Sequence, residues 1–205
     1  MPSVDAAYPD LRLVREHATT VALAGVFADQ QFKVIVAGRP LSADWDEVLS
    51  GVLFATGRVT ASEFGALVAG ELGGEFMPWL MDAWLLAQSA AAAAAINDST
   101  RDALADAEDP APVFDALAVS GARVYARTAV AVAANFGAHD AAVSAGARTK
   151  TWVSSGSPRH SSLSGQTVGI GETFGNGMKW PGDPAGGAGE VVNCRCSIRF
   201  NTEGA

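Results

Sequence analysis

The sequence predicts an α+β protein that is mainly α-helical in residues 1–146 and ends, in residues 147–205, in a small α+β module with short antiparallel strands. Two observations support this fold class. Apolar residues recur at helical spacing over most of the first part, where alanine dominates the composition. In the second part, short β-prone runs alternate with clusters of Gly, Pro and Ser, which interrupt helices. With 205 residues and 49% hydrophobic composition, the chain is long enough to bury a packed core.

The first predicted helix covers residues 9–38, as one long element or as two shorter ones. A second helix is expected to begin at Ser42 and to end near Gly57. Thr60 and Glu63 have the spacing of a capping box, in which a hydroxyl and a carboxylate each satisfy a free amide at a helix start. A third helix is therefore predicted to start there.

Residues 76–96 are the most apolar segment and include several Trp, Met and Leu side chains. The segment is long enough to cross a bilayer, but Asp82, Gln88 and a run of weakly apolar alanines argue against insertion. We expect no membrane association. The segment is instead predicted to be a central helix whose large side chains face the core, or else a partner chain.

An acidic stretch at residues 97–112 predicts a break in the helices, with a candidate hinge at residues 106–112. A further helix is predicted over residues 113–145, with Gly121 as a weak point and Gly146 as its C-cap. Its small side chains would allow another helix or subunit to approach closely.

The strands of the module are predicted from alternating apolar and polar residues at 149–153 and 194–200. Both runs have the pattern of strands with one buried face, so we expect them to pair. Between them, Pro181, Gly182, Asp183 and Pro184 predict a turn.

Charge is distributed unevenly along the chain. Residues 1–146 carry 8 Lys and Arg against 18 Asp and Glu, a net charge of −10, whereas residues 147–205 carry 6 against 4, a net charge of +2. Duplex DNA would be repelled by the acidic part, so any contact with DNA is expected from the C-terminal module. Two cysteines one residue apart, without a signal peptide, favour synthesis in a reducing cytoplasm.

His160, Cys194 and Cys196 are the soft metal ligands of the module. A structural zinc site uses four ligands, and the fourth would have to be His139 or a carboxylate. The favoured alternative treats both cysteines as small hydrophobic residues on the buried face of a strand, with Arg195 pointing outward. We therefore expect no metal or other cofactor, and zinc is the alternative.

A Cys–His nucleophile would need a thiolate beside His160 and a third group that orients the imidazole. Nothing in the spacing supplies that group, and Ser161 and Ser162, being merely adjacent to His160 in sequence, do not form a triad. We expect no catalytic residue and no enzymatic activity.

Several residues of the module occur in an ordered series with recognisable spacing. Along the chain these are Trp152, Arg159, His160, Gly165, Phe174, Pro181, Asn193, Cys194, Arg195 and Cys196. The series resembles the C-terminal domain of the Mu F-like head morphogenesis proteins of tailed bacteriophages. Upstream, Arg127 and Thr128 are similar to part of the helix that precedes this domain. The chain departs from the family pattern at Ala129 and Ser157, where acidic residues are usual.

The resemblance implies a minor head (capsid) protein in the virion, present in the host cytoplasm during assembly. Its partners would be the portal protein and other head proteins, and it would assist head assembly, DNA packaging or DNA ejection at the portal vertex. Arg159, His160, Asn193 and Arg195 would first hold the module together and then contact a partner. Two alternatives stay open: an effector or toxin-type enzyme associated with a Mu F-like module, and a zinc-stabilised adaptor.

Overall fold

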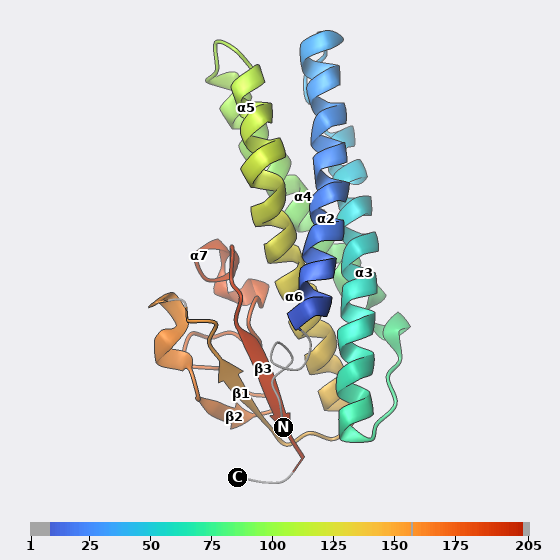
Figure 1. Cartoon of the computed structure of the whole chain (residues 1–205), viewed down its shortest axis with the longest axis vertical. Coiled ribbons are helices and arrows are strands. Elements are labelled where there is room, and N and C mark those ends of the chain that lie inside the picture. Colours follow the sequence, from blue (N-terminus) through green and yellow to red (C-terminus); the bar gives the residue numbers. More distant parts are fainter. Residues whose placement is uncertain (1–8, 157, 203–205) are drawn as a thin grey trace.

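The computed structural model describes residues 9–156 and 158–202, and it confirms the α+β class with a helical N-terminal part. Long helices form the larger part of the fold (Figure 1). In chain order, the helical elements are α2 (Pro9–Gln31) with a π-helical end η1 (Phe32–Val36), α3 (Asp44–Leu72), the short 3₁₀ helix η2 (Pro78–Met81), α4 (Asp82–Ala105), α5 (Ala111–Ala116), the π-helical η3 (Leu117–Gly121) and α6 (Ala122–Ser144).

Helix α3 lies at the centre of this layer and packs against α2, α4 and α6. Its buried face includes Leu49, Leu53, Phe64 and Val68, which recur at helical spacing. Helix α6 packs on α3 through small side chains, as the alanine-rich sequence predicted. The central position of α3 explains why its composition is apolar over so many turns.

The C-terminal module contains a three-stranded antiparallel sheet in the order β2–β1–β3. Its elements are β1 (Thr149–Val153), the 3₁₀ helix η4 (Pro158–Leu163), β2 (Thr167–Gly169), the 3₁₀ helix η5 (Pro184–Gly186), the short helix α7 (Ala188–Val191) and β3 (Ser197–Asn201). Strands β1 and β3 pair with Trp152 opposite Ile198, so the predicted pairing of these two segments is confirmed.

The predicted start of the last strand at Cys194 is wrong, because β3 begins at Ser197. The carbonyl groups of the three preceding residues face side chains of the helical part instead of a neighbouring strand. Arg12 donates to the carbonyls of Cys194 and Arg195 at 3.4 and 3.2 Å, and Asn135 donates to that of Cys196 at 3.1 Å. This segment therefore ties the module to α2 and α6.

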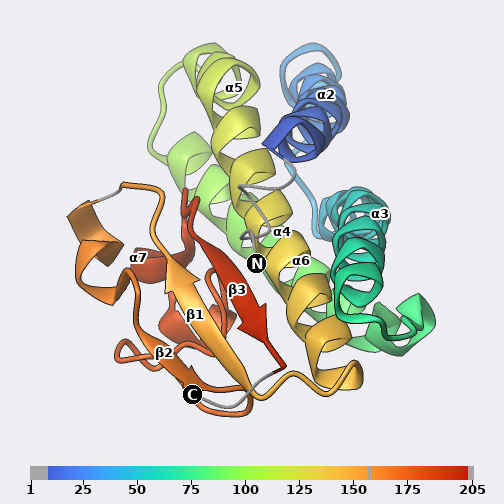
Figure 2. The same cartoon turned by 60° about the horizontal axis from the view of Figure 1, so that its bottom comes forward.

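One hydrophobic cluster joins the two parts of the chain. It contains Phe64 of α3 and Phe136 of α6 together with Trp152, Trp180 and Ile198 of the module. Figure 2 shows β3 lying beside α6, so the sheet covers one flank of the helical layer. The module is thus held in a fixed position by buried apolar contacts.

The prediction of separate helices ending near Gly57 and beginning at Thr60 is wrong, since α3 runs continuously through both positions. Gly57 sits in the interface with α6, 3.9 Å (from its ideal Cβ position) from the Cβ of Ala133, where a small residue suits close packing. Thr60 is buried within the helix and donates to the carbonyl of Thr56, and Glu63 pairs with Arg15 of α2. The Thr60 hydroxyl and the Glu63 carboxylate, which were predicted to form a capping box, therefore have other partners within α3 and on α2.

The acidic break is shorter than predicted, because α4 continues to Ala105. Asn97, where the break was expected to begin, is buried in α4 and hydrogen-bonds to Gln30 at 3.0 Å and to Asp46 at 2.8 Å. Helix resumes at Ala111, within the candidate hinge, and the π-helical turn η3 ends at Gly121, the predicted weak point.

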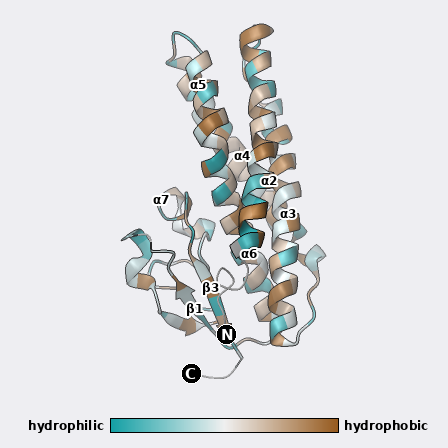
Figure 3. Ribbon diagram, viewed as in Figure 1, coloured by the Kyte–Doolittle hydropathy of each residue, from teal (hydrophilic) through white to brown (hydrophobic). Residues whose placement is uncertain are grey.

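Two helical segments, Asp44–Leu72 and Pro78–Ala105, are long and apolar enough to cross a membrane by length and composition alone. Figure 3 shows hydrophobic residues interspersed with more polar ones along α3, the first of these segments. The large side chains at the start of the second segment divide between two environments. Met81 and Leu85 are buried, whereas Trp79 is 61% and Leu80 64% exposed.

Candidate functional site

The three soft donors of the module converge in the structure. The ligand atoms of His160, Cys194 and Cys196 all lie within 4.8 Å of one another. Nδ1 of His160 is 3.5 Å from Sγ of Cys194 and 3.4 Å from Sγ of Cys196. All three side chains are buried. These residues form a group with the chemistry and proximity needed to bind a metal ion, and we call it the Cys–His group.

Local structure explains how the group is assembled. Just before β3, the side chains of residues 194–196 point alternately to opposite sides. As predicted, this alternation buries Cys194 and Cys196 and leaves Arg195 exposed. Arg195 donates to Glu16 of α2 at 3.0 Å. The imidazole comes from η4, which follows β1 after a short connection. Ser157, one of the two departures from the family pattern, lies outside the described residues.

Trp152 of β1 packs against the imidazole of the Cys–His group. Its side chain is fully buried, and its ring lies edge-on to the ring of His160 with centroids 5.2 Å apart. Phe174 packs edge-on against the same indole at 5.0 Å. The indole of Trp152 therefore packs against the imidazole, and Phe174 packs against the indole in turn, which restricts the movement of both rings.

Glu190 supplies the orienting group that the sequence did not reveal. Its Oε2 lies 2.7 Å from Nε2 of His160, and this hydrogen bond lowers the pKa of Glu190. When Nε2 carries the proton of a neutral imidazole and donates a hydrogen bond to this carboxylate, Nδ1 is left with a lone pair that faces the two sulfurs. The spacing of the sequence did not supply this orienting residue, and the structure does. Glu190 lies in a Gly- and Ala-rich stretch without any periodic signal, so only tertiary structure identifies it.

The two thiols share one hydrogen bond and behave differently as acids. The hydrogen bond from Cys194 lowers the pKa of Cys196 to about 4, and a hydrogen bond from the backbone of Ser155 acts in the same direction. That same bond, together with burial, raises the pKa of Cys194 above its usual range. The arrangement thus favours one thiolate and one thiol.

His139, proposed as a fourth ligand, is not part of the Cys–His group. Its Nε2 lies 3.1 Å from the carbonyl of Ile170, which also accepts a hydrogen bond from the buried Lys150 at 2.7 Å. Burial, followed by repulsion from Lys150, lowers the pKa of His139 to about 4. Burial also lowers the pKa of Lys150, to about 8. His139 and Lys150 therefore form a buried polar pair that is separate from the Cys–His group and belongs to the core.

The other residues of the resemblance connect the loops of the module to one another and to α6. Arg159 donates to the carbonyl of Gly189, within α7, and to that of Val192, immediately after it. Asn193 has a positive φ of 59° and makes two hydrogen bonds to α6. Its amide donates to Oγ1 of Thr128 at 2.9 Å, and its Oδ1 accepts from Arg127 at 2.7 Å. Residues 127, 128 and 193, far apart in sequence, are thereby joined.

Gly165 and Pro181 occupy turns. Gly165 has φ +83° and donates its amide to the carbonyl of Trp152 at 2.9 Å, which is a conformation that suits glycine. Pro181 is buried in the predicted turn, which closes with a hydrogen bond from the amide of Asp183 to the carbonyl of Trp180. The predicted turn is confirmed.

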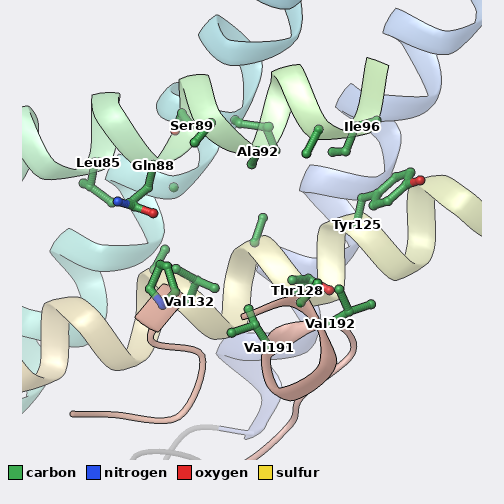
Figure 4. Close-up of a pocket in the computed structure, with 18 of the residues that line it drawn as sticks. Leu85, Gln88, Ser89, Ala92, Ile96, Tyr125, Thr128, Val132, Val191 and Val192 are labelled. Atoms are coloured by element: carbon green, nitrogen blue, oxygen red, sulfur yellow. The ribbon is translucent and has the colours of Figure 1, made fainter. Parts of the chain in front are cut away.

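A cavity of about 720 Å³ separates α4 from α6 and is closed on one side by the segment around α7 (Figure 4). Its lining is mostly apolar and includes Ala92 and Ile96 of α4 and Val132 of α6. Val191 and Val192 contribute the wall from the module. The residue before them, Glu190, is the partner of His160, so the Cys–His group and this wall are directly connected.

Comparison of the chain with family models, with curated proteins and with solved structures found no match. Function must therefore be inferred from the geometry of the chain itself and from its motif resemblance.

Proposed function

We propose that this chain is a minor head protein of a tailed bacteriophage, associated with the portal vertex and assisting head assembly, DNA packaging or DNA ejection. The observation that carries the proposal is spatial. Elements of the resemblance that are spread over residues 127–196 meet around Trp152, His160 and Asn193 through direct contacts. A motif series that arose by coincidence would not be expected to form one connected cluster.

The geometry favours a protein that binds other proteins over an enzyme that converts a substrate. The exposed fraction is 1% for His160, 2% for Cys194 and 0% for Cys196, so the thiols offer no open surface to a substrate. By contrast, Trp79 and Leu80 of η2 and Leu86 of α4 are exposed, and large exposed apolar side chains are typical of surfaces that bind other proteins. The net charge of −10 in residues 1–146 favours protein partners over DNA for the helical part.

Mass spectrometry of purified virions and proheads tests the head function. We expect the chain in one or both particles at low copy, and we expect it to co-purify with the portal protein. Absence from virions and proheads would overturn the proposal, and modification of a host substrate by the purified chain would then favour the effector alternative. A Trp79→Ser/Leu80→Ser variant is expected to weaken portal binding, whereas Val119→Ser, at the opposite end of the helices, should not.

For the cofactor of the module we propose zinc. Sulfur and imidazole are the ligands that Zn²⁺ prefers, and their convergence in the Cys–His group is the observation that favours a zinc-stabilised adaptor. This second candidate function is compatible with the first, because an adaptor of this kind can act within a phage head.

A further inference from the structure

We infer that His160, Cys194 and Cys196 form a zinc site with three protein ligands, in which His160 binds through Nδ1 and Glu190 is the carboxylate that holds the imidazole from the other side. The inference rests on the zinc proposed as cofactor and is independent of the head function. It assigns an atom and a role to each of four residues, and each assignment can be tested.

The spacing of the donor atoms already fits a bound ion. With Zn–S of about 2.3 Å and Zn–N of about 2.0–2.1 Å, a tetrahedral ion separates a sulfur ligand from a nitrogen ligand by about 3.6 Å. The observed separations from Nδ1 of His160 are 3.5 Å to Cys194 and 3.4 Å to Cys196. An ion could therefore bind with little movement of the side chains.

The imidazole is oriented as a metal ligand requires. Metal-binding histidines usually donate their second ring N–H to a carboxylate or carbonyl, which fixes the tautomer and the direction of the ring. Glu190 accepts from Nε2 of His160 at 2.7 Å, and Asn176 donates to the same carboxylate oxygen at 3.4 Å. Nδ1 of His160 contacts the two sulfurs, and thiols are poor hydrogen-bonding partners for a buried imidazole nitrogen. A metal ion would satisfy that nitrogen far better.

Zinc would tie together segments that make few regular hydrogen bonds. His160 comes from η4, and the two cysteines come from the segment just before β3. Glu190 of α7 is linked to the site by its hydrogen bond to the imidazole. Strand β2 has only three residues, and much of the module is irregular. Because metal binding stabilises the folded state that contains the preformed site, the ion is expected to stabilise these loops together with the α7 wall of the cavity.

Among residues 9–156 and 158–202, no fourth His, Cys, Asp or Glu joins the group. The remaining coordination position is therefore available to water or to a group from a partner. Zinc sites with three protein ligands keep a fourth coordination position, at which water exchanges with other ligands. The burial of both cysteines makes that exchange dependent on local opening of the module.

The first test uses the full chain, purified under reducing conditions without chelator and titrated with Zn²⁺ or Co²⁺ alone. We expect one zinc per chain by elemental analysis. With Co²⁺ we expect a sulfur-to-metal charge-transfer band together with the visible absorption of a tetrahedral ion. A folded chain that binds no zinc, or a cobalt spectrum without the sulfur band, would overturn the inference.

The second test compares substitutions of the three zinc ligands with a substitution of Glu190, which contacts a ligand but not the metal. His160→Ala, Cys194→Ser and Cys196→Ser should each abolish stoichiometric binding, but these variants can also fail to fold. Glu190→Gln retains all three ligands, and it should weaken zinc affinity about 10- to 100-fold while the fold persists. His17→Ala and Glu172→Gln are matched controls that should bind like the wild type. Equal affinity of Glu190→Gln and Glu172→Gln would contradict the role assigned to Glu190.

A third measurement does not depend on any variant. If zinc protects the sulfurs, a chelator should increase the rate at which a thiol reagent labels Cys194 and Cys196 by at least tenfold, and added zinc should reverse the increase. If the cysteines are merely buried hydrophobic residues, labelling will be equally slow with and without chelator, and the inference fails. Metal content is measured on the isolated chain, so its failure is distinguishable from absence of the chain in virions.

Discussion

Gly137 of α6 lies directly against the main chain of Ala61 in α3. A Cβ atom placed on Gly137 would be 2.1 Å from the carbonyl oxygen of Ala61, well inside van der Waals contact. The two helices therefore cross at a point where only a hydrogen atom fits between them. This contact sets the distance between α3 and α6, and with it the position of the sheet that packs on α6.

Replacement of Gly137 by alanine is expected to destabilise the protein by about 1–3 kcal/mol, because overpacking at this crossing outweighs the better helix propensity of alanine. Gly51 is the control, since it also lies within a long helix, α3, but an added Cβ there meets no atom within 4 Å. Gly51→Ala should stabilise by about 0.5–1 kcal/mol. Urea unfolding measures both changes, and a similar shift for the two variants would contradict the steric explanation.

Stability should fall as the pH decreases from about 6.5 to 4. The pKa of His139 is about 4 in the folded protein and 6.5 ordinarily, so in this interval the unfolded chain binds a proton that the folded chain does not. We expect a loss of about 2 kcal/mol from this residue between pH 7 and pH 5. In His139→Gln this contribution should disappear, whereas His17→Gln, at an exposed position, should keep the wild-type slope. Unfolding free energies at several pH values compare the three proteins, and identical slopes would count against the assignment.

Glu16 of α2 is expected to hold the Cys194–Cys196 segment against the helices. Its carboxylate lies 3.0 Å from Arg195, 3.3 Å from Arg12 and 3.8 Å from Arg127, and it is largely buried. Glu16→Gln removes the negative charge shared by these guanidinium groups and should destabilise the protein by about 1–3 kcal/mol.

The control for Glu16 is Glu75→Gln, an exposed residue in the loop after α3, which should change stability by less than about 0.5 kcal/mol. Hydrogen exchange of the amides of residues 193–196 gives a second readout. Faster exchange in Glu16→Gln than in Glu75→Gln is expected, and unchanged exchange would show that α2 does not fix this segment.

Asp183 organises the turn between β2 and α7. Its two carboxylate oxygens accept from the amides of Lys179 and Ala185 at 2.8 and 3.0 Å, and the side chain is buried. Asp183→Ala should cost about 1–2 kcal/mol, and Asp183→Asn should cost less because its carbonyl oxygen can still accept one of the bonds. Asp109→Ala is the comparison, as Asp109 accepts from the amide of Ala111 in an exposed turn. Thermal unfolding should show a clearly smaller change for that variant.

Local patterns were sufficient for much of the fold. Helical spacing, alternating strand residues and the Pro–Gly–Asp–Pro turn predicted the α+β class, the pairing of β1 with the C-terminal strand and the turn at Pro181. These features depend on residues close together in sequence, whose periodicity matches helix or strand geometry. The same local signals misplaced the break at Gly57 and Thr60, because packing between α3 and α6 overrides a weak capping signal.

By itself, the sequence determined the fold class of this protein, the pairing of its first and last strands and the identity of its soft donors, since a cysteine or histidine is visible wherever it lies. Only the tertiary structure decided that His160, Cys194 and Cys196 meet, that Glu190 orients the imidazole and that His139 lies elsewhere. The physical reason is that these contacts join residues about 30 positions apart through irregular loops. Their approach is set by the apolar packing of Trp152 and by hydrogen bonds to α2 and α6, which no local pattern encodes.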